Sequence, residues 1–137
     1  MRRRFHTESS GWAGLSLSGD GFKPVIDGAG ILKLQAEVRG IRVDRALGQY
    51  LVRLADASRK HPSLKMGCST RGMLSLFRIV QARAYRDGRD YVIPEDVKAE
   101  AIHALAHRLS LDTKAKYSGV KKEDIVRQIL ESTPVGI

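Results

Sequence analysis

The stretch GCSTRGMLSLFRIVQARAYRDG, residues 67–88, decides how this chain folds. Its apolar side chains recur at helical spacing and predict the main helix of the protein, from Met73 to Arg86. Ser69 is suited to cap the N-terminus of this helix through its side-chain oxygen. Gly88 is suited to the left-handed backbone conformation in which many helices end. We therefore expect residues 69–88 to form one long, well-delimited helix.

One face of this helix is broad and apolar, and so wide a face indicates burial on two sides. Truncation of Leu74 or Phe77 to alanine is expected to leave a cavity and to cost about 2–5 kcal/mol. Arg71, Ser75 and Arg78 fall on a more polar face. The apolar face comprises Met73, Leu74, Phe77, Val80, Gln81 and Ala84, widened by Leu76 and Ile79.

Arg71 lies in the first turn of the helix, where a cation is unusual. A positive charge there opposes the helix macrodipole unless an anion lies nearby. A helix N-terminus and a guanidinium group together make a good receptor for a phosphate. We therefore hypothesise that Arg71, with Gly67 and Ser69 at the helix N-terminus, contacts a nucleotide phosphate held mostly by another domain. The alternative is an arginine that is simply solvated.

Helical patterns before and after this stretch predict an all-α fold, a small bundle of four or five helices. Asp44 caps a helix that ends near Lys60, because Pro62 disfavours helical backbone in the preceding residue. Pro94 begins another helix, and the two residues that follow it, Glu95 and Asp96, are acidic. The expected helices are 28–37, 44–60, 73–86, 94–109 and 121–131, with very short extended pieces at 41–43 and 91–92, a loop at 62–68 and a polar, lysine-rich connection at 111–120.

Two parts of the chain differ in composition. Residues 1–23 are rich in glycine and serine without a sustained period, and we expect an irregular tail or the remnant of something larger. Trp12 in this tail either anchors a contact or is exposed. Residues 24–137 are expected to form one helical domain, long enough to bury a core.

The formal net charge is +9 and the pI is about 10.1, a balance that favours polyanionic partners. The basic residues nevertheless occur in separate clusters, which is more typical of a solvated surface than of a binding stripe. A single cysteine, no apolar run of membrane-spanning length and no signal-peptide core predict a cytoplasmic protein. The clusters are Arg2–Arg4, Arg39/Arg42/Arg45, Arg59/Lys60/Lys65, Arg86/Arg89 and Lys114/Lys116/Lys121/Lys122.

Neither a metal site nor a catalytic residue is expected. His103 and His107 share a helix face at the spacing that zinc ligands use, but no further ligands accompany them. Cys68 lies beside a helix N-terminus without an adjacent base, so a small, partly buried side chain explains it better than a nucleophile.

Three motifs in this order resemble the C-terminal lid of MoxR-type AAA+ ATPases: GCSTR at 67–71, GRDYVIPEDVK at 88–98 and HRL at 107–109. The segments Pro24–Ile26, Leu34–Gln35 and Val43 also look like the stretch that leads into that lid. The resemblance covers roughly residues 24–137. It implies a lid that packs on an αβα nucleotide-binding core, and it gives Arg71 the position of the sensor 2 arginine, which approaches the γ-phosphate of ATP. Arg78, two turns further along the helix, is then a candidate either to support Arg71 or to touch a neighbouring subunit.

The chain departs from the family pattern in three places. Thr70 stands where proline often follows the serine, and Ile93 stands where threonine often precedes Pro94. Because isoleucine cannot cap with its side chain, Asp96 at the third helical position is expected to accept a hydrogen bond from the backbone instead. The largest departure is the core, because no G-x-x-x-x-G-K-[ST] motif is present. We expect no ATP hydrolysis by this chain alone.

The resemblance implies a lid module that requires ATP and Mg²⁺ only together with a core domain. Its partners would be that core and the neighbouring subunits of a ring, in chaperone-like remodelling of a client complex. The alternative is a basic helical nucleic-acid-binding or adaptor module. That alternative predicts basic residues gathered on one helix, whereas here they are dispersed and no reader motif appears.

Overall fold

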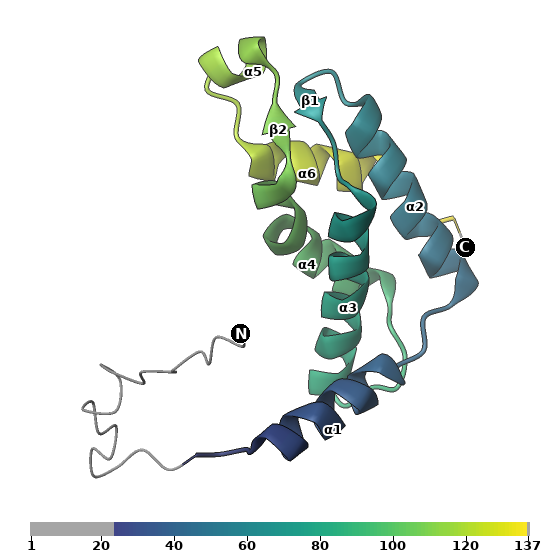
Figure 1. Ribbon diagram of the computed structural model, residues 1–137. Coiled ribbons are helices and arrows are strands. Elements are labelled where there is room, and N and C mark those ends of the chain that lie inside the picture. The colour runs from purple at the N-terminus through teal and green to yellow at the C-terminus, as the bar shows by residue number, and fades with distance from the viewer. Residues whose placement is uncertain (1–23, 137) are drawn as a thin grey trace, which may run out of the picture.

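Two helices that run in opposite directions, α2 and α3, form the centre of the structure (Figure 1). A computed structural model describes residues 24–136 of the chain; the expected tail at 1–23, with Trp12, and Ile137 lie outside the described residues. The elements are α1 (Gly28–Arg39), α2 (Arg45–Lys60), β1 (Leu64–Met66), α3 (Thr70–Arg86), α4 (Pro94–Leu105) with a 3₁₀ turn (Ala106–Arg108), β2 (Ser110–Leu111), α5 (Thr113–Tyr117) and α6 (Lys122–Ser132).

The predicted all-α class is confirmed, with six α-helices in the described residues rather than four or five. The additional helix, α5, has only five residues and no apolar period that would predict it. Its first turn depends on Asp112, whose side chain accepts a hydrogen bond of 2.7 Å from the backbone N–H of Ala115. A helix this short is held by its cap and its neighbours rather than by its own propensity.

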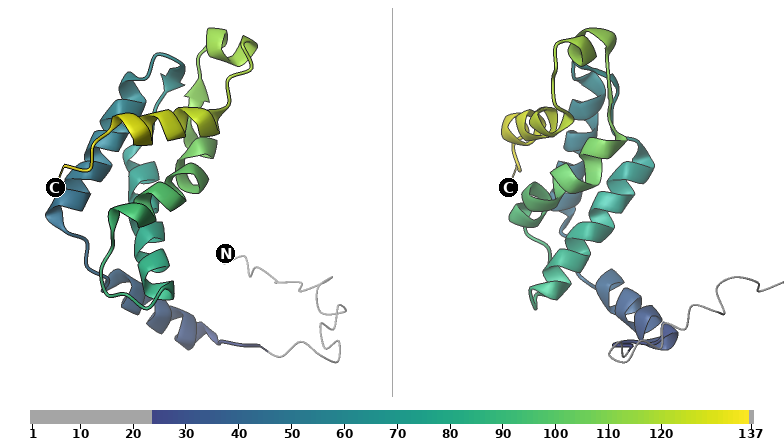
Figure 2. Two further views of the ribbon diagram at one scale, coloured as in Figure 1. Left: turned by 180° about the vertical axis from the view of Figure 1, so that it is seen from behind. Right: turned by 90° about the vertical axis from the view of Figure 1, so that its left-hand side faces the viewer.

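The helices α1 and α5 lie at opposite ends of the molecule (Figure 1). α1 crosses the C-terminal end of α3, while α5 lies beyond the small sheet formed by β1 and β2. α6 crosses the back of the bundle over α2 and α4 (Figure 2). The N-terminal end of α3 therefore points towards the sheet, and its C-terminal end towards α1.

Short extended pieces pair where the chain passes between helices. The pieces expected at 41–43 and 91–92 meet in a parallel bridge between Arg42 and Tyr91. The strands β1 and β2 pair antiparallel, with Leu64 opposite Leu111, although the sequence predicted a loop and a polar connection there. Strands of two or three residues are too short for an alternating pattern to reveal them.

The buried face of α3 is centred on Leu76 and Val80, whose side chains are fully buried between α2 and α4. Leu74, expected on that face, is 61% exposed, and its predicted cavity cost is therefore wrong. Side chains two residues apart on an α-helix point in directions about 200° apart around the helix axis, so Leu74 and Leu76 cannot face the same neighbour. The largest side chains buried with them are Tyr50, Leu54, Ile125 and Val97.

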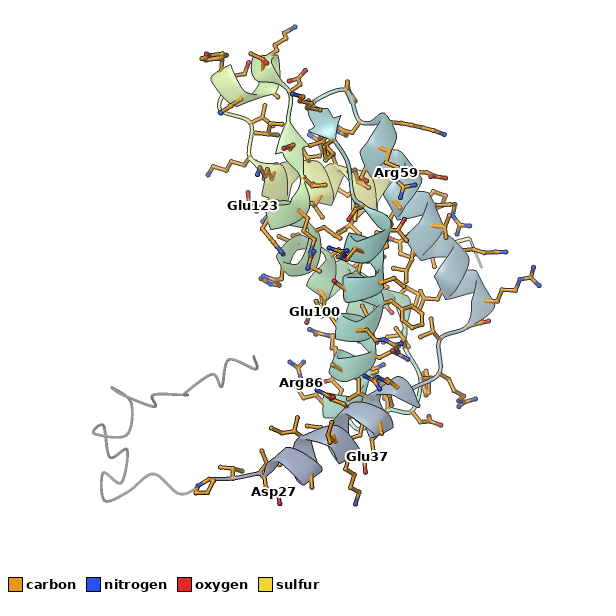
Figure 3. All side chains as sticks on the ribbon, viewed as in Figure 1. Asp27, Glu37, Arg59, Arg86, Glu100 and Glu123 are labelled. Carbon is orange, nitrogen blue, oxygen red and sulfur yellow. The ribbon has the colours of Figure 1, made fainter. Side chains whose placement is uncertain are left out.

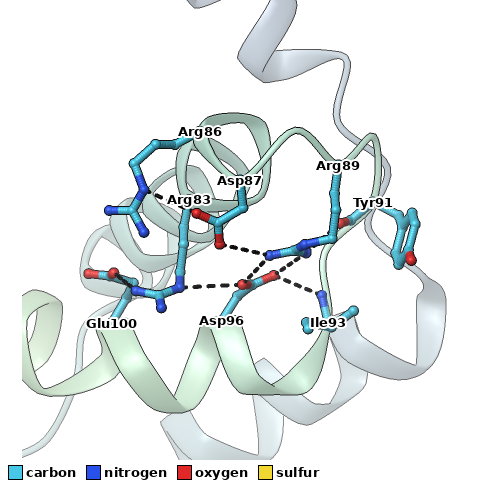
Figure 4. A network of polar contacts seen from close by, with 8 residues as sticks. All are labelled: Arg83, Arg86, Asp87, Arg89, Tyr91, Ile93, Asp96 and Glu100. Carbon is cyan, nitrogen blue, oxygen red and sulfur yellow. Dashed lines mark hydrogen bonds and ion pairs between the residues drawn. The ribbon is translucent and has the colours of Figure 1, made fainter.

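The connection between α3 and α4 is closed by a network of charged side chains around Asp96 (Figure 4). Asp96 is only 2% exposed and accepts two hydrogen bonds from the guanidinium of Arg89, of 2.9 and 2.7 Å. The Nε atom of Arg83 lies 3.4 Å from the same carboxylate. As the sequence predicted, Asp96 also accepts from the backbone N–H of Ile93, at 2.9 Å. Gly88, at φ +75°, makes the left-handed turn that brings Arg89 back towards α4.

This network also sets the protonation of Asp96. Burial alone would raise the pKa of the carboxyl group. The hydrogen bonds from Arg89 and Ile93 and the charges of Arg89 and Arg83 outweigh burial and hold this pKa below its ordinary value. Asp96 is therefore ionised in the folded protein over the whole neutral range.

Leu76→Ala is expected to lower the free energy of unfolding by about 2–5 kcal/mol, because it leaves a cavity beneath α3. Leu74→Ala is the matched control on the same helix and is expected to cost less than about 1 kcal/mol, since its side chain is largely exposed. Urea unfolding of the two variants measures both values. Equal losses would contradict the burial that the structure assigns to α3.

Asp96→Asn is expected to cost about 3–5 kcal/mol at pH 7, because it leaves Arg89 facing a neutral partner. Since the folded-state pKa of Asp96 is lowered, its ionised form stabilises the fold above the ordinary value of 3.8. That stabilisation is lost as the pH falls through the folded pKa, so the decline of stability between pH 5 and pH 3 should be shallower in the variant. Urea unfolding across this range measures the slope. Asp90→Asn, in an exposed pair with Arg42, is the control and should cost no more than about 1 kcal/mol.

Candidate nucleotide-contacting site

The first turn of α3 is capped by Ser69, as the sequence predicted. The Oγ atom of Ser69 accepts a hydrogen bond of 3.1 Å from the backbone N–H of Gly72. No acidic residue lies in this first turn. The positive end of the helix dipole is therefore balanced by the cap and not by a carboxylate.

Gly67 holds the approach to this turn against the end of α2. A Cβ atom at Gly67 would lie 2.6 Å from the backbone Cα of Arg59, closer than any side chain tolerates. The next residue is fixed by two hydrogen bonds: the N–H of Cys68 donates to Ser58 Oγ at 2.8 Å, and Arg59 Nε donates to the Cys68 carbonyl at 3.1 Å. The glycine of the G-x-S-x-R motif thus has a packing role, which positions the N-terminus of α3 relative to α2.

The guanidinium of Arg71 is free to meet a ligand. The Arg71 side chain is exposed, and no carboxylate of residues 24–136 forms an ion pair with it. Its backbone is held in place, because Ser75 Oγ donates a hydrogen bond of 3.0 Å to the Arg71 carbonyl. An arginine on a fixed backbone with an uncommitted head group is suited to bind an anion supplied from outside the domain.

Arg108 lies beside this turn, a placement that sequence reasoning missed. Its Nε donates to the Ala104 carbonyl at 3.1 Å, and its NH2 donates to Ser75 Oγ at 3.3 Å. Hydrogen bonds therefore run from the end of α4 through Arg108 and Ser75 to the carbonyl of Arg71. The only signal for Arg108 in the sequence was the HRL motif at 107–109, and this motif does not reveal that Arg108 contacts α3.

An apolar groove of about 420 Å³ opens between α2 and α3, and Thr70, the residue before Arg71, is part of its lining. Leu74 and Val52, each 61% exposed, lie along it. Exposed apolar side chains gathered along a groove are typical of a surface that binds a partner. Met73, Phe77, Leu51 and Ala55 complete most of its lining.

The remaining candidates have structural explanations. Arg78 does not join Arg71, because its NH1 donates to the buried Gln81 Oε1 at 2.9 Å, near the contact of α3 with α1. Burial raises the pKa of the Cys68 thiol, despite the nearby charges of Arg59 and Arg108, so little of it is reactive thiolate. His103 and His107 are exposed, and no cluster of metal-binding side chains occurs within residues 24–136.

The antiparallel pair α2–α3, with α4 and α6 packed on it and a capped helix that presents a free arginine, defines a helical lid domain. The family model described as the AAA lid domain matches residues 56–129, more than half of the chain. The chain therefore belongs to the AAA lid domain family, and its relatives are MoxR-type AAA+ ATPases.

Curated relatives agree with this assignment. The chain is 38% identical to the uncharacterized protein YeaC of Bacillus subtilis over 115 residues, 84% of this chain and 36% of that protein. It is 31% identical to chaperone MoxR1 of Mycobacterium tuberculosis, over 80% of this chain and 32% of that protein. Protein MoxR of Methylorubrum extorquens is 32% identical over 64% of this chain and 28% of that protein. The chain thus spans about a third of the length of the curated relatives it matches.

A solved structure shares the arrangement of the helices. The crystal structure of a protein described as a "putative ATPase" from Cytophaga hutchinsonii superposes with a TM-score of 0.74 at 29% identity, over 77% of this chain and 35% of that one. Among the helices that the structure describes, none is long and apolar enough to cross a membrane.

Gly67→Ala is expected to destabilise the domain by about 1–3 kcal/mol, because the new methyl group would overlap the backbone of α2. Gly48→Ala is the matched control: it lies inside α2 with nothing within 4 Å of its Cβ position, and it should stabilise the helix by about 0.5–1 kcal/mol. Thermal and urea unfolding measure both changes. A neutral Gly67→Ala variant would rule out a packing role for this glycine.

Proposed function

We propose that this chain acts as the lid of an ATP-hydrolysing AAA+ assembly, with Arg71 as the sensor 2 arginine. The single observation that supports this role is the uncommitted guanidinium of Arg71 at a capped helix N-terminus without acidic residues. A γ-phosphate held by a separate core would meet both the guanidinium and the positive end of α3. ATP binds this site more favourably than ADP because only ATP carries that phosphate.

The residues around Arg71 support its orientation. Gly67 and the Ser69 cap hold the N-terminus of α3, while Ser75 holds the Arg71 carbonyl. Fixed donors stabilise an anion better than mobile ones, because they need no reorganisation when the ligand binds. Arg108 adds a second positive charge beside the same turn.

The groove between α2 and α3 is the proposed surface for the nucleotide-binding core. Covering Leu74 and Val52 would remove their apolar side chains from water and would bring the nucleotide next to Arg71. In this arrangement the core supplies the phosphate-binding loop and the Mg²⁺ ligands, and residues 24–137 are the lid domain. Ring assembly, chaperone-like remodelling of a client and a cytoplasmic location follow from the same proposal.

Arg71→Ala is expected to lower the affinity for ATP at least about tenfold and to leave the affinity for ADP nearly unchanged. A hybrid tests this, in which residues 24–137 replace the aligned part of the "putative ATPase" from Cytophaga hutchinsonii, whose remaining length would supply the core. Titration with fluorescent ATP and ADP analogues gives both affinities. The same substitution in the isolated chain should change the free energy of unfolding by less than about 0.5 kcal/mol.

Arg45→Ala is the matched control, because Arg45 is also an exposed arginine in the first turn of a helix. It lies at the N-terminus of α2, which runs antiparallel to α3, and so at the end of this helix pair remote from Arg71; it should change neither affinity. If both variants lowered the ATP affinity equally, the loss would reflect general charge, and the sensor role of Arg71 would be wrong. Unfolding of the isolated Arg71→Ala chain would equally contradict it, since it would make Arg71 a structural residue.

A further inference from the structure

Two lysine clusters that lie about fifty residues apart in the sequence come together at one end of the folded chain. The pairing of β1 with β2 brings the segment 60–66 next to the segment 112–122, with Leu64 opposite Leu111. The N–H of Asp112 also donates to the carbonyl of Ser63 at 2.9 Å. Figures 1 and 2 show β1, β2 and α5 together at this end, which we call the lysine tip (residues 60–66 and 112–122).

The lysine tip holds six of the nine lysines of the chain and one carboxylate. That carboxylate, Asp112, is already used to cap α5. None of the six lysines forms an ion pair within residues 24–136. Long side chains project outward around this end in Figure 3, where Arg59 marks the last turn of α2. The six are Lys60, Lys65, Lys114, Lys116, Lys121 and Lys122.

So many like charges on a few short elements repel one another and weaken the fold there. The sheet and α5 that carry them are small, with little buried apolar area to offset the repulsion. An anionic partner would relieve this repulsion. Two of the five separate basic clusters that the sequence indicated thus lie side by side in the structure.

Apolar side chains are exposed among these charges. Tyr117, in α5, is 87% exposed, and Met66, next to Lys65, is 66% exposed. Tyrosine and methionine are enriched at protein interfaces, where apolar anchors are surrounded by a polar rim. Between the two segments lies a hollow of about 280 Å³, bordered by Ser63, Lys114 and Ser118.

We propose that the lysine tip docks an acidic, carboxylate-rich segment of another protein, with Tyr117 as the apolar anchor. This surface lies at the end of the molecule opposite α1, and the proposal does not depend on the role of Arg71 (Figure 1). The acidic cluster at the α3–α4 connection cannot supply this segment from a second copy of the chain, because Asp87, Asp96 and Glu100 are already paired with arginines. Two copies that each carry a net charge of +9 also repel one another, which favours a different, acidic chain as the partner.

A nucleic acid fits this surface less well. Single-stranded nucleic acid is bound through several aromatic rings, and the lysine tip has one, Tyr117. Duplex readers place a helix or a sheet in a groove, whereas α5 has a single turn and the two strands have two and three residues. The tip also carries lysines and no arginine, so the planar fork that pairs with bases is absent from it.

Binding of a synthetic peptide to the full chain tests the proposal. The probe is a labelled 14-residue peptide of aspartate and glutamate with two leucines, and fluorescence anisotropy gives its affinity at low and at physiological salt. Lys65→Glu/Lys116→Glu should weaken binding at least about tenfold, because it reverses two charges of the tip. Lys33→Glu/Lys98→Glu, on the exposed sides of α1 and α4, makes the same change in net charge and should weaken binding less than about twofold.

Tyr117→Ala should weaken binding of the peptide but not of a variant peptide in which serine replaces both leucines. A peptide that binds no more tightly than about millimolar would overturn the proposal, as would equal losses in the two double variants. A 14-nucleotide oligonucleotide is the competing probe. If it bound more tightly than the peptide and lost binding in Lys65→Glu/Lys116→Glu, the tip would be a nucleic-acid surface and the proposal would be wrong. Circular dichroism of every variant verifies that the fold is retained.

Discussion

The carboxylate of Asp96 links three parts of this domain: the start of α4, the connection between α3 and α4, and the C-terminal half of α3. It caps α4 by accepting a hydrogen bond from the N–H of Ile93. It also accepts hydrogen bonds from both terminal nitrogens of the Arg89 guanidinium and lies near Arg83 on α3. Because the group is buried, each of these partners is needed to offset the loss of water. Asp96 and its arginine partners thus fasten the connection between α3 and α4, the two helices that pack most extensively against each other. The GRDYVIPEDVK motif contains the parts of this network in chain order. Gly88 makes the left-handed turn, Arg89 pairs with the carboxylate, Pro94 starts α4, and Asp96 supplies the carboxylate.

Most features that are local in sequence were predictable, and those that depend on distant neighbours were not. One local prediction was wrong in part: Asp44 occupies the N-cap position of α2, but its side chain accepts no hydrogen bond from the first turn. The cap at Ser69, the turn at Gly88 and the acceptor role of Asp96 all follow from residues within one helical turn. The burial of Leu76 in place of Leu74 could not be predicted in this way, because a wide apolar stripe does not reveal which side of it a neighbouring helix covers. The same limit applies to α1, which was predicted as a helix with an apolar side but has no buried residue.

The candidate site divides in the same way. Arg71 was singled out from its position in the first turn alone, and the structure gives it an exposed side chain with no carboxylate partner among residues 24–136. The contact of Arg108 with Ser75 joins residues 33 positions apart, which a motif cannot express. The close approach of Gly67 to Arg59 likewise depends on how α2 ends. Sequence patterns therefore singled out Arg71, Gly67 and Ser69 as candidates, whereas the packing around them, including the contact of Arg108, required the fold.

The length of α3 has a mechanical consequence. Its 17 residues make a rod about 25 Å long, with Arg71 near one end. At the other end, Gln81 donates to the carbonyl of Ile41 at 2.7 Å, and the hydroxyl of Tyr85 contacts Glu37 of α1, close to Arg86 (Figure 3). A tilt of the rod by about 5° about its midpoint would move each end by about 1 Å in opposite directions. α3 thus connects the turn that carries Arg71 to the surface that holds α1 through one continuous helix.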